Sequence, residues 1–332
     1  MKKLLRVLAI IVVVIIAGVI AGLGYFKSKF PVKIEVENIK VESTPERLQR
    51  GDYLVHHVVG CIDCHSDRDF SKFAGPIVAG TLGRGGFEFN NQLAGVPGSI
   101  YAANITPAGI GDYSDGELLR VITTGINKKG EALFPLMPYM HYGHGVACED
   151  LYSIITYIRS LNPIENKIPE RHLDFPMNLI VNTIPSPANI PDKIPAKSDT
   201  LAYGEYVINA VACFDCHTKL DHGKPLPGME YAGGFEFHFP NGDLVTSANI
   251  TPDVETGIGA LNKQDFIAKF KAYDNEAARN IKVADHAKNT VMPWTALAGM
   301  TEEDLGAIYT YLRTVKPVHN SVITFRPGKV NL

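Results

Sequence analysis

The longest apolar stretch of the chain lies near its N-terminal end. Residues 7–26 read VLAIIVVVIIAGVIAGLGYF and contain no charged side chain. At a rise of about 1.5 Å per residue, a helix of this length covers the roughly 30 Å hydrocarbon core of a bilayer. The apolar part of a secretory signal peptide is shorter, and only residues 22–24 offer a poor small-x-small cleavage site. The pattern therefore predicts a transmembrane anchor over residues 1–26.

Apolar residues further along the chain recur with the spacing of amphipathic helices. Residues 151–161 place an apolar stripe on one helical face, and residues 305–315 repeat it. Threonine followed by proline at 44–45 marks a helix start, and residues 114–117 form a capping box. Little of the sequence alternates with a period of two, so we expect no sizeable sheet. The pattern predicts an all-α fold.

Most motifs of the chain occur twice and in the same order. The segment GDYLVHHVVGCIDCH at 51–65 returns as GEYVINAVACFDCH at 204–217. GGFEF, ANITP, GIG and a methionine-proline-aromatic triplet also recur, each 145 to 155 residues after its first copy. An ordered offset of this kind indicates a duplicated domain.

Prolines separate the two copies. Seven of them fall between residues 163 and 197. Because proline interrupts helices and strand ladders, we expect a stiff connector with one short helical turn near residues 177–181. The predicted divisions are an anchor at 1–26, a stalk at 27–44, domain one at 45–163, a proline-rich linker at 164–198, domain two at 199–320 and a C-terminal tail at 321–332.

Composition and charge narrow the class of protein only slightly. The 332 residues are 45% hydrophobic and 20% charged, which suits a globular chain of about two domains. A net charge of -3 gives no large field of one sign. Nucleic acid is therefore not an expected partner.

The residues with the clearest chemistry form two copies of a Cys-x-x-Cys-His motif. The copies are Cys61, Cys64 and His65 in the first repeat and Cys213, Cys216 and His217 in the second. This is the attachment signature of a c-type haem. On one helical face, two thiols can reach the two vinyl groups of a porphyrin, and the adjacent histidine then faces the iron. The sequence thus predicts two covalently attached haem c groups.

Other kinds of cysteine site fit the sequence less well. A four-cysteine zinc site usually has about 15–20 residues between its pairs, whereas these pairs lie 152 residues apart. A thioredoxin-like pair requires a strand and helix pattern that the sequence lacks. The fifth cysteine, Cys148, has Glu302 as its counterpart and is expected to be an inert thiol. His56 and His57 also lack counterparts and are expected at the surface or at a helix cap.

Each repeat also offers a methionine as the second axial ligand. Met137 lies 72 residues after the first motif histidine, and Met292 lies 75 residues after the second. Ligation by histidine and methionine raises the reduction potential of a haem. Met140, His141 and His144 lie in the same loop as Met137. Ligation by either histidine would make that haem bis-histidine, with a lower potential.

Residues around the motifs are candidates for supporting roles. A backbone carbonyl often orients a ligating imidazole, and we expect it from Pro76 in the first repeat and from Pro225 or Pro227 in the second. Asn104 fits a glycosylation pattern, but its twin Asn249 predicts a structural loop near each haem instead.

The order of these motifs resembles a known family. C-x-x-C-H, GGFEF, NITPD, TGIG, MPW and AIYTYLR resemble the cytochrome c subunits of membrane-bound bacterial alcohol, aldehyde and gluconate dehydrogenases, over about residues 46–320. The resemblance implies axial pairs of His65 with Met137 and of His217 with Met292. It also implies electron transfer from a partner dehydrogenase to the respiratory chain. Those subunits usually carry three haems, whereas this chain has two motifs.

The same resemblance implies where the chain works. Haem is attached to such motifs outside the cytoplasmic membrane. The expected topology is therefore a single-pass protein of the inner membrane, with its N-terminus inside and both haem domains in the periplasm. The expected fold is two tandem class I cytochrome c domains after a transmembrane helix, and it is all-α.

We expect an electron carrier without catalytic activity of its own. It would pass electrons from a membrane or periplasmic donor, a dehydrogenase or a quinol-oxidising complex, to a respiratory acceptor such as an oxidase. The alternative is a dihaem cytochrome c peroxidase, which requires a haem with an open sixth site. The matched methionines argue against that enzyme. Thiosulfate oxidation with Cys148 as a distal haem ligand ranks last.

Overall fold

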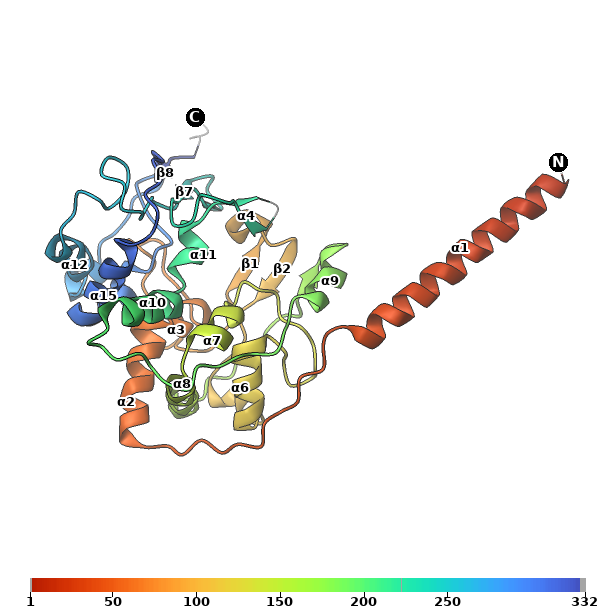
Figure 1. Cartoon of the computed structure of the whole chain (residues 1–332), viewed down its shortest axis with the longest axis horizontal. Helices are drawn as coiled ribbons and strands as arrows, with labels where there is room; N and C mark the ends of the chain where they lie inside the picture. The colour runs from red at the N-terminus through yellow and green to blue at the C-terminus, as the bar shows by residue number, and fades with distance from the viewer. Residues whose placement is uncertain (1, 222, 329–332) are drawn as a thin grey trace.

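The computed structural model describes residues 2–221 and 223–328 and begins with one long helix. Helix α1 (Lys2–Lys29) stands away from the body of the molecule, and none of its residues is buried (Figure 1). Its length and composition are sufficient to cross a membrane. The predicted apolar helix is therefore present, with residue 1 outside the described residues. The predicted tail at 321–332 is described only to residue 328.

We call residues 45–163 half one and residues 199–320 half two. The helices of half one are α2 (Pro45–Tyr53), the π-helical turn η1 (Leu54–Val58), α3 (Cys61–His65), α4 (Asn91–Ala94), α5 (Pro107–Ile110), α6 (Asp115–Thr124), α7 (Tyr139–Gly145) and α8 (Cys148–Ser160). Those of half two are α10 (Thr200–Val211), α11 (Cys213–His217), α12 (Lys263–Lys271), α13 (Glu276–Arg279), α14 (Trp294–Leu297) and α15 (Glu302–Leu312). The predicted starts are confirmed, because Thr44 caps α2 and Ser114 forms a capping box with Glu117 at α6.

In each half the first long helix crosses the last one at a glycine. Helix α2 packs on α8, and α10 packs on α15. A Cβ at Gly51 would lie 2.1 Å from Ser153 O, and a Cβ at Gly204 would lie 2.3 Å from Ala307 O. Only glycine allows these close approaches, because any side chain would meet the backbone of the other helix. The sequence repeat is thus also a structural repeat.

The chain before the first motif is one residue longer than its counterpart. Cys61 follows Gly51 by ten positions, whereas Cys213 follows Gly204 by nine. The π-helical turn η1 absorbs the extra residue, while α10 stays regular. Each half can therefore keep the same helix crossing at its glycine and still be followed by the same Cys-x-x-Cys-His turn.

The prediction of an all-α fold is wrong. The structure is 42% helical and 9% strand, and the described residues form three small antiparallel sheets, so the fold is mixed. The sheets are β1 (Glu88–Asn90), β2 (Gly98–Tyr101) and β3 (His172–Leu173); β4 (Leu220–Asp221) and β5 (Lys224–Pro225); and β6 (Glu236–His238), β7 (Leu244–Thr246) and β8 (Phe325–Arg326). Strands this short hold too few residues to show a period of two, which is why the pattern missed them.

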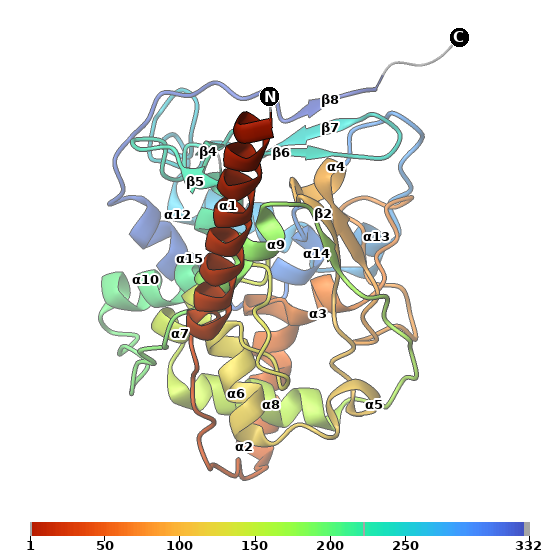
Figure 2. The same cartoon turned by 90° about the vertical axis from the view of Figure 1, so that its right-hand side faces the viewer.

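The linker is packed into the fold. Strand β3 from the linker pairs with β2 of half one, and β8 from the tail pairs with β7 of half two. The predicted short helical turn is confirmed as α9 (Met177–Ile180) and the 3₁₀ turn η2 (Val181–Thr183). Figures 1 and 2 show α9 on the side of the body from which α1 emerges.

The predicted stalk is held along helix α6. Val41 N donates to Asp115 Oδ2 over 2.8 Å. The backbone of Glu37 passes over Gly116, where a Cβ would lie 1.9 Å from the Glu37 carbonyl oxygen. The anchor is thus joined to half one by a short segment that is itself packed on the body.

A matched pair of buried carboxylates joins the halves. Asp150 of α8 and Asp304 of α15 occupy equivalent places in the repeat, and each is 2% exposed. Tyr206 of half two donates to Asp150 over 2.6 Å, and Tyr53 of half one donates to Asp304 over 2.5 Å. The two tyrosines are also repeat equivalents, so the contact has approximate two-fold symmetry. Buried residues of both halves form one hydrophobic core, and the division into two domains stays a prediction.

Candidate functional site

Each Cys-x-x-Cys-His motif forms one helical turn behind a left-handed residue. Gly60 precedes α3 with a φ of 65°, and Ala212 precedes α11 with a φ of 58°. This conformation ends the preceding helix and redirects the chain. At Ala212 it carries the strain of a non-glycine residue at positive φ. The matched breaks place the thiols of each motif on a short helical turn of their own.

None of the four motif cysteines forms a disulfide within the described residues. Cys61 and Cys213 are half-buried, whereas Cys64 and Cys216 are exposed. Burial raises the pKa of the Cys61 and Cys213 thiols to about 12. A thioredoxin-like pair needs a thiol of lowered pKa, so the site does not fit that redox chemistry.

A backbone carbonyl orients each motif histidine. His65 Nδ1 donates to Ala103 O and His217 Nδ1 donates to Ala248 O, each over 2.7 Å. Because a carbonyl can only accept, Nδ1 carries the proton, and Nε2 keeps its lone pair for a metal. Burial lowers the pKa of both imidazoles, which favours this neutral, ligating form.

The prediction that a proline carbonyl orients these imidazoles is wrong. Pro76 O accepts from Asp69 N over 3.0 Å, and Pro225 lies in β5 opposite Leu220. The orienting carbonyls come from the alanines of the two ANITP segments. The repeat of that segment was a usable signal, but an alanine side chain gives no hint that its backbone has this role.

A glycine brings each alanine carbonyl close to its histidine. Gly85 N donates to the carbonyl of the first motif histidine over 2.8 Å, and Gly233 N donates to that of the second over 2.7 Å. Their φ values are 67° and 74°, and a Cβ would lie 2.4 Å from Ala103 C and 2.5 Å from Ala248 C. The first glycine of each GGFEF segment is thus required by conformation and by space.

The asparagine of each ANITP segment fixes this loop. Asn104 and Asn249 are buried, and each accepts a hydrogen bond from the threonine hydroxyl two residues on. Asn104 Nδ2 donates to Ile164 O, and Asn249 Nδ2 donates to Val318 O, each over 2.8 Å. Each amide thus ties the loop to the chain that follows the last helix of its half. The prediction of a structural loop is confirmed.

The two methionines stand on matched turns. Pro138 has φ of −79° and ψ of 50°, and Pro293 has φ of −81° and ψ of 64°, close to an inverse γ-turn. In both, the following aromatic residue donates its N–H to the methionine carbonyl over 2.8 Å. Met137 and Met292 are half-buried and pack against the main core, as Cys61 does. The backbone thus presents both thioethers in the same way.

One of the two histidines that share the loop of Met137 is hydrogen-bonded to the other half. His141 Nε2 donates to Asp215 Oδ1 over 2.8 Å, and Asp215 belongs to the second motif. This hydrogen bond raises the pKa of His141. His144 is exposed on α7. Sequence reasoning missed the pairing of His141 with Asp215, because the two residues belong to different halves and lie 74 positions apart in the chain.

The two motifs lie near one another across this contact. Tyr142 is buried, and burial raises the pKa of its hydroxyl, with further contributions from charge on Cys61, Cys64 and Asp215. The pKa of the Cys216 thiol is raised by burial and also by charge on Asp215 and on Cys64 of the other half. The geometric link at this place is the hydrogen bond from His141 of half one to Asp215 of the second motif.

The histidines before the first motif are not surface caps. His57 Nδ1 donates to Ala296 O of α14 over 2.7 Å, which places this ring at the contact between the halves. His56 Nε2 pairs with Tyr157 OH over 2.8 Å. Both rings are half-buried, so the prediction of a surface or capping role is wrong.

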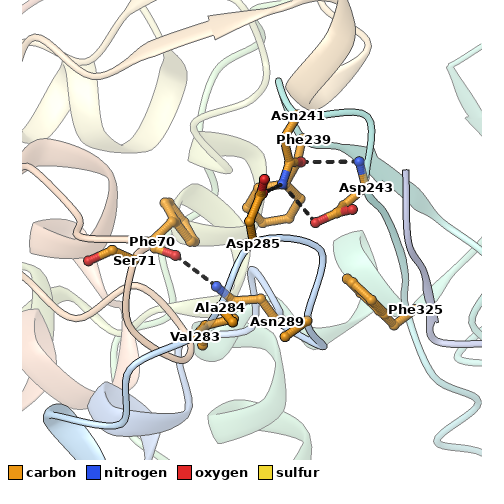
Figure 3. Close-up of a pocket in the computed structure, with 11 residues that line it drawn as sticks. Phe70, Ser71, Phe239, Asn241, Asp243, Val283, Ala284, Asp285, Asn289 and Phe325 are labelled. Atoms are coloured by element: carbon orange, nitrogen blue, oxygen red, sulfur yellow. Dashed lines mark hydrogen bonds between the residues drawn. The ribbon is translucent and has the colours of Figure 1, made fainter. Parts of the chain in front are cut away.

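One cavity of the described residues lies away from the motifs. It measures about 260 Å³ and opens where the loop of Phe70 from half one meets half two (Figure 3). Three of its polar side chains are joined, since Asn241 Nδ2 donates to Asp243 Oδ2 and to Asp285 Oδ1. Among its described lining residues there is no predicted haem ligand or attachment cysteine. The cavity belongs to the contact between the halves.

Several known proteins with a similar sequence are cytochrome subunits of dehydrogenases, although no family model matches the chain. The chain is 26% identical over 282 residues to the gluconate 2-dehydrogenase cytochrome c subunit of Pantoea cypripedii, covering 81% of this chain and 59% of that protein. It is 25% identical over 303 residues to the alcohol dehydrogenase (quinone) cytochrome c subunit of Gluconacetobacter polyoxogenes, covering 86% and 60%. It is 26% identical over 285 residues to the fructose dehydrogenase cytochrome subunit of Gluconobacter japonicus, covering 81% and 52%.

These comparisons confirm the resemblance found in the motif order. The chain is similar to cytochrome c subunits of dehydrogenases, and it spans between 52 and 60% of the length of these curated relatives. The donor groups fit a c-type haem in each half: two free thiols on one turn, an imidazole with Nε2 free, and a methionine on a matched turn.

Proposed function

We propose that this relative of dehydrogenase cytochrome c subunits is a membrane-anchored electron-transfer subunit carrying two covalently attached haem c groups. The proposed attachment and axial residues are Cys61, Cys64, His65 and Met137 in half one, and Cys213, Cys216, His217 and Met292 in half two. The observation that carries the proposal is the duplicated orientation of the imidazoles, each of which donates Nδ1–H to an alanine carbonyl over 2.7 Å. A histidine held in this tautomer is prepared to bind a metal through Nε2.

The residues of the chain define what each site does. A bound haem iron supplies a one-electron couple whose potential depends on its axial ligands. The alanine carbonyls hold the imidazole rings in one tautomer and orientation. Met137 and Met292, half-buried at the edge of the core, supply soft sulfur ligands that favour a raised potential. Because the ligands are fixed by turns and hydrogen bonds, little of the chain has to move when an electron arrives.

The arrangement of the halves favours a relay within the chain. Tyr142 lies within electrostatic range of both motifs, and His141 of half one bonds directly to Asp215 of the second motif. Two haems attached to adjacent motifs can exchange electrons without a diffusing carrier. We therefore propose that an electron enters at one half and leaves at the other.

The relatives suggest the partner and the compartment. Since they are subunits of gluconate, alcohol and fructose dehydrogenases, we propose that this chain accepts electrons from a membrane-bound dehydrogenase and delivers them to a respiratory acceptor. Helix α1 would hold the chain in the cytoplasmic membrane as a single span, with both haem sites on the periplasmic side. Tethering keeps the haems at a high effective concentration near their partners.

Haem stoichiometry tests the proposal. The purified full-length chain should contain two haems as measured by its pyridine haemochrome spectrum. Replacing Cys213 and Cys216 together with serine should leave one, because only the second attachment site is lost. Cys148→Ser is the matched control and should leave both. A haem content unaffected by loss of the second motif would contradict the proposal, and rapid peroxide consumption by the intact protein would favour the peroxidase alternative.

A further inference from the structure

The most exposed large apolar side chain of the described residues lies in the linker. Phe175 is 79% exposed, more than any large apolar residue of α1, where Leu4 has the highest value at 75%. Ile180, at the end of α9, is 43% exposed. A single exposed apolar residue needs no explanation of its own. The position of Phe175 relative to the anchor makes it informative.

Phe175 lies beside the point where the anchor meets the body. Ile34 of the stalk and Met177 of α9 pack against the same small core cluster. Ile34 is also fixed to α6, because Arg120 Nη1 donates to its carbonyl over 3.2 Å. Figures 1 and 2 agree in placing α9 on the side facing α1. The apolar part of the linker and the exit of the anchor therefore share one surface of half one.

The stalk is too short to hold this surface far from a bilayer. Five peptide units join Lys29, the last residue of α1, to Ile34. A fully extended chain of that length reaches at most about 18 Å. The headgroup layer alone is about 5–8 Å thick on each side of the hydrocarbon core. A membrane that holds α1 therefore has this face of half one at its surface.

We infer that Phe175 and Ile180 insert into the interfacial layer of the same lipid bilayer that holds α1. The exposed polar neighbours His172 and Asp174 would stay at the level of the headgroups, as in elements that lie in the interface without crossing it. The inference rests on the proposed membrane anchor and adds an orientation to it. Half one faces the lipid, whereas α12 and α15 of half two lie on the far side of the body (Figure 1).

Photocrosslinking to lipid tests this orientation. The full-length, haem-loaded chain is placed in phosphatidylcholine vesicles, with one p-benzoylphenylalanine introduced at a time, as Phe175→p-benzoylphenylalanine, Ile15→p-benzoylphenylalanine or Val254→p-benzoylphenylalanine. Position 15 reports on the anchor. Position 254 is the matched control, because Val254 is a similarly exposed apolar residue, at 67%, in half two. On irradiation the ketone abstracts hydrogen from an acyl chain, and the two radicals combine into a lipid adduct that is read by mass.

The three positions separate the two proposals. The inference is supported if lipid adduct forms at positions 15 and 175 and the adduct yield at 175 is about tenfold that at 254. A ring inserted in the bilayer spends most of its time among acyl chains. Adduct at 15 alone, or equal adduct at 175 and 254, overturns the inference and leaves the anchor standing. No adduct at 15 means that the anchor itself fails. In native membranes, a protein adduct in place of lipid at 175 would also overturn the inference, because a partner then covers that surface. An unchanged haem spectrum shows that each variant is folded.

Discussion

The group that orients each motif histidine belongs to the backbone. Ala103 and Ala248 contribute only carbonyls, so other side chains at these positions would keep the hydrogen bond. Gly85 and Gly233 cannot be exchanged so freely, because a Cβ there would collide with the same alanines. The orientation of the imidazole therefore depends on the conformational freedom of a glycine. The proposed methionine ligands differ, since their side-chain sulfur is itself the functional group.

Replacing Met292 tests the second axial ligand. Met292→Ala should lower the potential of the haem in half two by an amount on the order of 0.1 V, within the roughly 0.8 V range over which axial ligands set haem potentials. The open position should also bind carbon monoxide in the reduced state. A redox titration and the visible spectrum of the reduced protein measure both effects.

Met300 provides the control for this substitution. It belongs to the same half, is fully buried, and fills the core. Met300→Ala should reduce stability by about 2–5 kcal/mol through the cavity it leaves, while the weak far-red band of methionine ligation stays. If Met292→Ala leaves that band and both potentials unchanged, Met292 is not the ligand.

Among the elements, α7 links the two motifs. It begins after the turn of Met137 and places His141 against Asp215 of α11. The hydroxyl of its Tyr142 donates to Val59 O, two residues before the first motif. The contact of His141 with Asp215 is partly buried, and a carboxylate beside an imidazole favours the imidazolium. A short helix of half one is thus connected electrostatically to the attachment turn of half two.

This contact predicts a pH dependence of stability. Because Asp215 raises the folded pKa of His141 above that of the unfolded chain, the stabilisation is fully present below about pH 6.5. It is lost as the pH rises through the raised folded pKa. For a partly exposed pair we expect roughly 0.2–1 kcal/mol. Denaturant unfolding at pH 5.5 and 8.5 should show a smaller difference in His141→Gln than in the native protein, since His286, paired with Asp243, still contributes in both. His144→Gln, exposed on the same helix, should behave like the native protein.

Sequence patterns predicted the elements whose signals are local. The cap at Thr44, the capping box at Ser114 and the turn at residues 177–181 are all formed by neighbours in the chain. The short strands were missed, because β3 and β8 exist only through pairing with distant segments. The orienting carbonyl of Ala103 and the partner of His141 were missed for the same reason. A contact between residues far apart in sequence leaves no periodicity to detect.

At the scale of the whole molecule, the halves are interlocked. Asp150 accepts a hydrogen bond from the hydroxyl of Tyr206 in the other half. It also accepts two hydrogen bonds, of 2.7 and 2.8 Å, from the guanidinium of Arg50 in its own half. Asp304 accepts a hydrogen bond from the hydroxyl of Tyr53 in the other half. Each buried carboxylate therefore needs both halves for its full set of partners, and an unmet buried charge is costly. These contacts fix the position of the two motif-bearing halves relative to each other.

The interlocked carboxylates predict that the two halves unfold together. Tyr53→Phe and Tyr206→Phe should each lower the free energy of unfolding by about 1–3 kcal/mol, because a carboxylate loses a charge-assisted hydrogen bond. Far-UV circular dichroism and haem absorbance should give one coincident denaturant transition for the native protein. Tyr309→Phe is the control, because its hydroxyl bonds to Leu261 O within half two and so crosses no interface. Tyr309→Phe should lower the free energy of unfolding by less than the other two substitutions and leave the two transitions coincident. Two separated transitions in the native protein, each reporting one haem, would mean that the halves are independent and that the crossed tyrosines do not hold the sites together.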